Sequence, residues 1–164
     1  MKTFVIVLLV LVVVGALLVA GLMARQRRQR EGMQQRFGAE YDRTVEQAGD
    51  RRTAERDLQD RTRRHETLHI KPLDPGSRDQ YTDQWRQTQE QFVDRPQAAV
   101  KQADNLVALV MQERGYPVGD FDQQVRDVSV EHSDAVGNYR SAHQISQLND
   151  DGSASTEQLR EAMV

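Results

Sequence analysis

The sequence predicts an all-α protein in which a single N-terminal transmembrane helix precedes a small multi-helix bundle. An uninterrupted apolar run opens the chain, apolar residues after it recur at helical spacing, and no convincing pair of alternating strands follows. The 164 residues leave about 130 for one compact domain. The expected parts are a short flank (1–3), the transmembrane helix (4–24), a basic juxtamembrane segment (25–36), a helical domain (37–148), and a polar loop with a short C-terminal helix (149–164).

The predicted transmembrane helix contains no charged or strongly polar residue. At 1.5 Å per residue, its length of about 31 Å matches the hydrocarbon core of a bilayer. A cleaved secretory signal is the alternative, but its apolar region is usually shorter, and Leu22 and Ala24 fit the small-residue cleavage pattern poorly. Val19 and Gly21 offer a weaker second cleavage site. A retained anchor in the cell membrane is therefore favoured.

Basic residues after the apolar run predict its orientation. Lys and Arg beside a span tend to stay in the cytoplasm, and only Lys2 precedes the run. We therefore expect a cytoplasmic domain, and an exported or secreted domain that acts at the cell wall is the alternative. The arginines would also contact the lipid bilayer, where anionic headgroups attract them. These membrane-flanking residues are Arg25, Arg27, Arg28 and Arg30.

Composition excludes several function classes. Residues 1–36 carry six basic residues against Glu31, a net charge of +5, and the total of -3 therefore leaves -8 on residues 37–164. An acidic domain is a poor nucleic-acid binder, so no nucleic-acid partner is expected. The chain has no cysteine, which excludes disulfides, thiolate metal sites and a thiol nucleophile. The scarcity of lysine among the basic residues suggests a GC-rich bacterial genome.

The domain reads as a succession of helices. A first helix from Phe37 breaks at Gly49 and Asp50, and a second one runs on to the turn around Pro72 and Pro75. The inward positions of these two helices are Phe37, Tyr41, Val45, Ala48, Ala54, Leu58 and Arg61. The next helix presents Tyr81, Trp85, Thr88 and Phe92 on one face.

The segment from Pro96 to Arg114 is the best amphipathic helix and is expected at the centre of the bundle. Gly115 ends it, and Asp120 is the expected N-cap of the following helix. A long helix and a short one capped by Ser155 or Thr156 complete the chain. The apolar positions expected inward are Ala99, Val100, Ala103, Leu106, Val107, Val110 and Met111 in the central helix, and Val136, Tyr139, Ala142, Ile145 and Leu148 in the long one.

One catalytic motif is present, because His65, Glu66 and His69 spell HExxH. On a helix, this spacing lets two histidines bind zinc while the glutamate serves as general base. The context argues against it, since arginines precede the motif and Pro72 would cut the helix just after it. A zinc metallopeptidase is kept as a remote alternative. The protein is expected to be non-catalytic, with no metal and no cofactor.

The loop that follows the central helix is a candidate docking surface. Aromatic residues on a loop held between two helices make good anchors for a protein partner, and the loop supplies Tyr116, Pro117, Asp120 and Phe121. The simpler interpretation, which we favour for these residues, is that they fold the loop onto the core.

Four strings carry a resemblance: RFGAEYDRTVEQAGDRR, RRHETLHIKPL, QFVDRPQAAVKQADNLVALVMQERGYPVGDFDQ and SVEHSDAVGNYRSAH. Together they resemble a family of short, membrane-anchored bacterial proteins of the actinobacterial type, to which no activity is assigned. The resemblance covers nearly all of residues 36–148. It implies a bacterial envelope setting and supplies no catalytic or cofactor residue. The leading hypothesis is therefore a non-catalytic interaction module at the bacterial cell membrane, with an unknown protein partner.

Overall fold

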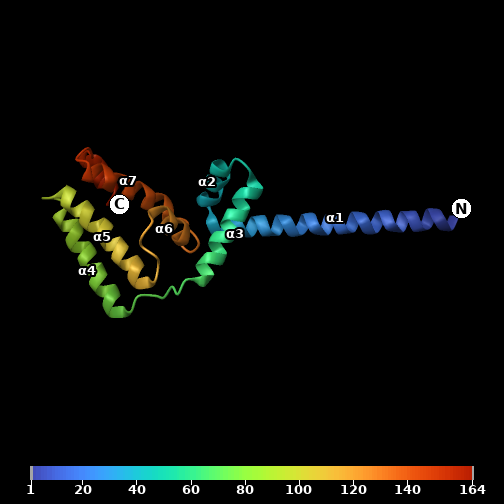
Figure 1. Cartoon of the computed structure of the whole chain (residues 1–164), viewed down its shortest axis with the longest axis horizontal. Helices are drawn as coiled ribbons and strands as arrows, with labels where there is room; N and C mark the ends of the chain where they lie inside the picture. The colour runs from blue at the N-terminus through green and yellow to red at the C-terminus, as the bar shows by residue number, and fades with distance from the viewer. Residues whose placement is uncertain (1, 164) are drawn as a thin grey trace.

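The computed structural model describes residues 2–163, without the side chains of residues 2–14, 16, 18, 19 and 26. Within the described residues all regular secondary structure is helical, which confirms the expected all-α class (Figure 1). The helices are α1 (Lys2–Phe37), α2 (Ala39–Ala48), α3 (Arg51–Thr67), α4 (Pro75–Gln91), α5 (Pro96–Arg114), α6 (Phe121–Val128), α7 (Val136–Asp150) and α8 (Thr156–Glu161).

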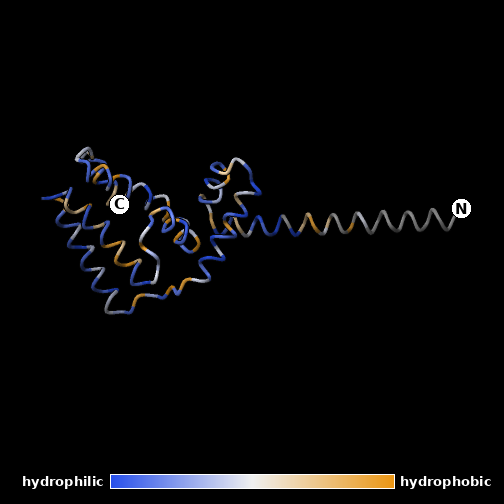
Figure 2. The backbone as a smooth tube through the Cα atoms, viewed as in Figure 1, coloured by the Kyte–Doolittle hydropathy of each residue, from blue (hydrophilic) through white to orange (hydrophobic). Residues whose placement is uncertain are grey.

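Helix α1 projects away from the other helices, with the N-terminus at its far end (Figure 1). Its described apolar residues Leu17, Leu22 and Met23 are 67%, 63% and 58% exposed. Figure 2 shows the hydropathy of α1, where most of the outer half is drawn in grey. Within the described part of the chain, none of the helices offers a stretch both long enough and apolar enough to cross a bilayer. The expected transmembrane segment, 4–24, falls largely on side chains outside the described set.

The C-terminal end of α1 belongs to the folded domain. Phe37 is the last residue of α1 and is only 1% exposed, whereas the sequence placed it at the start of a separate helix. The boundary lies one residue later because Gly38 adopts a positive φ of 48°, which favours glycine and allows the chain to turn before α2. Helix α1 therefore runs without a break into the folded domain.

The first core lies where α1, α2 and α3 meet. Asp50 caps α3 by accepting a 3.0 Å hydrogen bond from the backbone N–H of Thr53, and Gly49 supplies the left-handed turn before it. The break expected at these two residues is therefore present. The buried residues of this core are Phe37, Tyr41, Leu58 and Val130, with Met33 and Val45 packed against them.

The second core lies between α4, α5, α7 and α8, where α4 and α5 lie side by side (Figure 1). Its buried residues are Val100, Ala103, Ile145, Leu159 and Met163, with Trp85 and Phe92 against them. Ser155 caps α8 through a reciprocal capping box with Gln158, as the sequence suggested. Because Leu159 and Met163 are buried, the folded domain extends through α8.

Helix α5 has the bounds that the sequence predicted, Pro96–Arg114. Its inward face is narrower than expected, since Val107 and Val110 are only half-buried and line an open groove beside Trp85. Leu148, expected inward in α7, is also exposed at the surface. Helix α6 lies between the two cores and contacts both α3 and α7.

Candidate functional site

The HExxH residues do not lie together on one helix. Helix α3 ends at Thr67, and Leu68 after it is extended, so His69 stands outside the helix. The side chain of His65 is 11% exposed, whereas Glu66 and His69 are exposed. Among the residues that the structure describes, no group of three or more His, Cys, Asp or Glu is arranged to hold a metal ion.

The strand-like stretch after α3 packs on the end of α5. The backbone N–H of Lys71 donates a 2.9 Å hydrogen bond to the carbonyl of Arg114. Gly115 has a φ of +96°, and a Cβ built on it would lie 2.5 Å from the carbonyl oxygen of His69. Glycine is therefore required at this position for two reasons, the left-handed backbone and the close approach. This contact fixes where the loop after α5 begins.

Tyr116 holds that loop against α3 and the turn after α6. Its side chain is 4% exposed, and its hydroxyl donates to a carboxylate oxygen of Glu131 at 3.2 Å. The Arg114 guanidinium lies 5.4 Å from the ring centroid, within cation–π range. Burial and the neighbouring charge of Glu131 raise the pKa of the Tyr116 hydroxyl to about 12. The Nε2 atom of His65 lies 3.6 Å from the same Glu131 carboxylate.

The rest of the candidate docking loop divides into buried and exposed parts. The Phe121 ring stacks on His143 with centroids 3.6 Å apart, and Asp120 caps α6 by accepting from the backbone N–H of Gln123 at 3.0 Å. Pro117, Val118, Gly119 and Asp120 form an exposed tip. The two aromatic rings are thus used inside the domain, and the tip is the part that a partner can touch.

The arginines predicted to flank a membrane differ in their surroundings. Arg25, Arg27 and Arg28 are exposed on α1. Arg30 is half-buried, and its Nε lies 3.5 Å from a carboxylate oxygen of Glu55 on α3. The three exposed arginines are accessible to a binding surface outside the chain. Arg30 instead connects α1 to α3.

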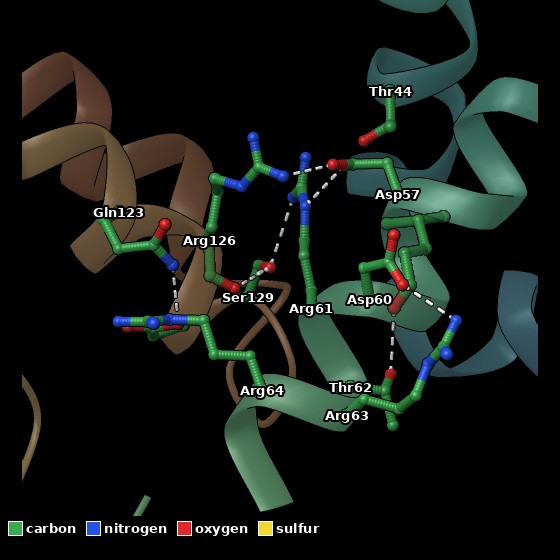
Figure 3. A network of polar contacts seen from close by, with 12 residues as sticks. Thr44, Asp57, Asp60, Arg61, Thr62, Arg63, Arg64, Gln123, Arg126 and Ser129 are labelled. Carbon is green, nitrogen blue, oxygen red and sulfur yellow. Dashed lines mark hydrogen bonds and ion pairs between the residues drawn. The ribbon is translucent and has the colours of Figure 1, made fainter. Parts of the chain in front are cut away.

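A partly buried network of ion pairs joins α2, α3, α6 and α7. Arg61 is 6% exposed and donates at 2.8 Å both to Glu40 and to Asp57. Arg140 donates to the two carboxylate oxygens of Glu40 at 2.6 and 2.7 Å. Arg126 reaches Asp57 from α6, so that Arg61 and Arg126 converge on one carboxylate (Figure 3). Burial alone would raise the pKa of Glu40, but the hydrogen bonds and charges of Arg140 and Arg61 outweigh it and lower that pKa below its usual value.

A second carboxylate lies deeper in the same interface. Asp127 is fully buried and accepts from Arg64 Nε at 2.9 Å and from Gln123 Nε2 at 2.8 Å. Ser129, also buried, accepts a longer hydrogen bond of 3.4 Å from Arg61. Because a buried charge without a partner is strongly destabilising, these contacts fix how α6 sits on α3.

A polar pocket of about 360 Å³ opens beside this network. Arg61, Arg126 and Arg140 form part of its wall, and Arg43 on α2 stands with them. Within the described residues Arg43 makes no ion pair. The amides of Gln47 and Gln144 add polar groups, and Phe121 and Val125 form an apolar stretch of wall. The pocket thus combines several hydrogen-bond donors with a short apolar surface.

Comparison of the chain with family models, with curated proteins and with solved structures found no match. Sequence analysis placed Arg61 on the inner face of its helix but did not identify its partners. Glu40 and Arg140 lie 100 positions apart, and no local pattern connects two residues at that separation. The only available signal was a charged residue at an inward helical position.

Proposed function

We propose that this protein is a single-pass, membrane-anchored helical module, without catalytic activity, whose domain docks a protein partner at the cytoplasmic face of a bacterial membrane. The observation that carries the proposal is the character of α1. Its described apolar residues Leu17, Leu22 and Met23 are exposed, exposed arginines follow at once, and the same helix ends in the first core at Phe37. Exposed apolar surface of this kind marks a contact with a membrane or another protein. The length and apolar character of residues 4–24 suit a bilayer.

The exposed loop tip supports the docking part of the proposal. Tyr116 and Phe121 pin the two ends of the loop to the domain, so the residues between them are presented by a fixed scaffold. Val118 at the tip is 37% exposed. A held loop loses little conformational entropy on binding, which favours its use as a contact surface.

Membrane insertion and orientation are tested together. Reporters that work only inside or only outside the cell are fused after Val164, and the anchor is checked for cleavage by intact mass. Inside activity with an uncleaved chain in the membrane fraction is expected. In the variant Leu17→Arg, a charge near the middle of the span costs about 3 kcal/mol, so the membrane-bound fraction should fall.

The control for that variant is Arg27→Gln, which keeps the apolar run intact. Outside activity, or a chain whose mass lacks the anchor, would contradict the cytoplasmic placement and favour the exported domain instead. A chain that stays in the soluble fraction would contradict the anchor itself.

Docking is tested by photo-crosslinking in living cells. A photoreactive amino acid placed at Val118 is expected to yield one adduct of defined mass. The same amino acid at Val93, which is 84% exposed and lies at the end of α4 away from the loop, should yield none. Equal labelling at both positions, or none at either, would refute the loop tip as the docking surface.

A further inference from the structure

We propose that the pocket between α2, α3, α6 and α7 binds a phosphate monoester group. The proposal rests on Arg43, Arg61, Arg126 and Arg140, which stand around a single pocket of about 360 Å³. It goes beyond the docking role and does not depend on which side of the membrane the domain occupies. The group could belong to a small soluble compound or to a lipid headgroup, and the two sources share the same chemistry.

The hydrogen-bonding capacity of the pocket exceeds what the protein uses. A guanidinium carries five N–H donors, and the three that belong to Arg61, Arg126 and Arg140 make six hydrogen bonds to described protein groups. More than half of their donors therefore have no acceptor in the described part of the chain. Those of the unused donors that face the pocket are available to a ligand.

The charged groups in and around the pocket also leave a positive surplus. Three guanidinium groups share two carboxylates, those of Glu40 and Asp57. Arg43 adds a positive charge, and Asp122 in the lining adds a negative one. The pocket thus keeps a positive surplus in a region of the chain, residues 37–164, whose net charge is -8. An anion is the ligand that this local field favours.

The arrangement suits a phosphate monoester better than a carboxylate. The arginines approach from four different helices, and a phosphate monoester offers three acceptor oxygens and close to two negative charges for donors from several directions. The volume exceeds what a bare phosphate needs and falls in the range of small-molecule sites. Phe121 and Val125 would contact the organic part of the ester.

The competing explanation is that these arginines only hold the helices together. Arg61, Arg126 and Arg140 cannot distinguish the two explanations, because each is part of an ion pair that stabilises the fold. Arg43 can, because it is exposed and forms no ion pair with the described residues. Its replacement should leave folding unchanged and weaken ligand binding.

The test uses the full chain in nanodiscs of phosphatidylcholine, titrated with phenyl phosphate by calorimetry. We expect binding of one equivalent, weakened about tenfold or more in Arg43→Gln, since a hydrogen bond to a charged group is worth that much. The matched control is Arg86→Gln, an exposed arginine on α4, which should bind as the unaltered chain does. The unfolding temperature of each variant without ligand confirms that the fold is kept.

A second arm identifies the source of the group. In nanodiscs that contain phosphatidic acid, a headgroup in the pocket would raise the unfolding temperature and compete with phenyl phosphate, and Arg43→Gln would abolish both effects. Binding of phenyl phosphate without these lipid effects assigns the site to a soluble ester. Failure of both probes to bind, or binding that Arg43→Gln leaves unchanged, would overturn the proposal, and neither result bears on membrane insertion or on the loop tip.

Discussion

Glu40 on α2 and Arg140 on α7 form a bidentate ion pair across 100 residues of chain. Glu40 is 4% exposed and shares one carboxylate oxygen with Arg61. The pair therefore joins the half of the domain built around α1, α2 and α3 to the half that contains α7. Apolar packing within each half is supplemented by charge at their junction.

Removing Arg140 should destabilise the protein strongly. In Arg140→Met the buried carboxylate of Glu40 keeps only Arg61, and breaking a buried pair costs about 3 kcal/mol. Urea unfolding followed by circular dichroism measures the change. The control is Arg160→Gln, whose ion pair with Glu157 is mostly exposed and should therefore contribute little to the free energy of unfolding. Equal effects of the two substitutions would show that the buried pair does not hold the halves together.

The contribution of Glu40 should depend on pH. Its pKa is lowered in the folded protein, because the arginines outweigh the effect of burial. A lowered pKa adds stability above the unfolded value, near 4.5, and this stability is lost as the pH falls below that value towards the folded pKa. The stability difference between the unaltered chain and Glu40→Gln should therefore be constant near neutrality and shrink in acid. Unfolding curves measured across the acid range test this, and a difference that does not change with pH would argue against the assignment.

Replacing Gly115 should disturb the loop after α5. In Gly115→Ala the new Cβ would meet the carbonyl oxygen of His69, and the positive φ of this residue is unfavourable for alanine. The left-handed backbone alone costs about 1 to 2 kcal/mol, and the steric contact adds to that cost. Gly119→Ala is the matched control, because a Cβ there has no atom within 4 Å. If both variants unfold at the same urea concentration, the packing of His69 on Gly115 is not as described.

Tyr116 and the half-buried Tyr139 should ionise late. Burial comes first among the causes that raise the pKa of Tyr116 and Tyr139 to about 12, aided by the charges of Glu131 and Asp104 respectively. A raised pKa gives stability that is complete below the unfolded value, near 10, and is lost as the pH rises from there towards 12. Ultraviolet titration should show an ionisation near pH 12 that becomes smaller in Tyr116→Phe. Ionisation of all the tyrosines near pH 10 in the folded protein would contradict their burial.

Sequence patterns predicted the helices whose ends are marked by nearby residues. They did not predict the contacts between helices that lie far apart in the sequence. Pro96, Gly115, Asp120 and Ser155 mark helix ends through backbone chemistry that acts within a few residues, and the structure has ends at each of them. The continuation of α1 to Phe37 was not predicted, because the basic residues that follow the apolar run carry no apolar periodicity that would mark them as helical.

The candidate site could be predicted only in part. Tyr116 and Phe121 were recognised by type, and the interpretation that the loop folds onto the core agrees with their contacts. Of the pocket arginines, Arg61 was expected to face inward, whereas Arg126 and Arg140 were missed because a search for apolar periodicity treats them as surface residues. Val110 and Leu148 were placed inward for the corresponding reason, since helical periodicity does not show which apolar positions another helix will cover.

Helix α1 runs unbroken from its exposed apolar residues into the first core. It therefore fixes the rotation of the domain relative to those apolar residues. An α-helix turns by about 100° and advances about 1.5 Å per residue. Adding one residue between Ala24 and Met33 would therefore rotate the loop tip and the arginine-lined pocket by about 100° around the helix axis, relative to the apolar part of α1. The distance along the axis would grow by only about 1.5 Å. The direction in which both surfaces face is thus set by the number of residues in this stretch as well as by their chemistry.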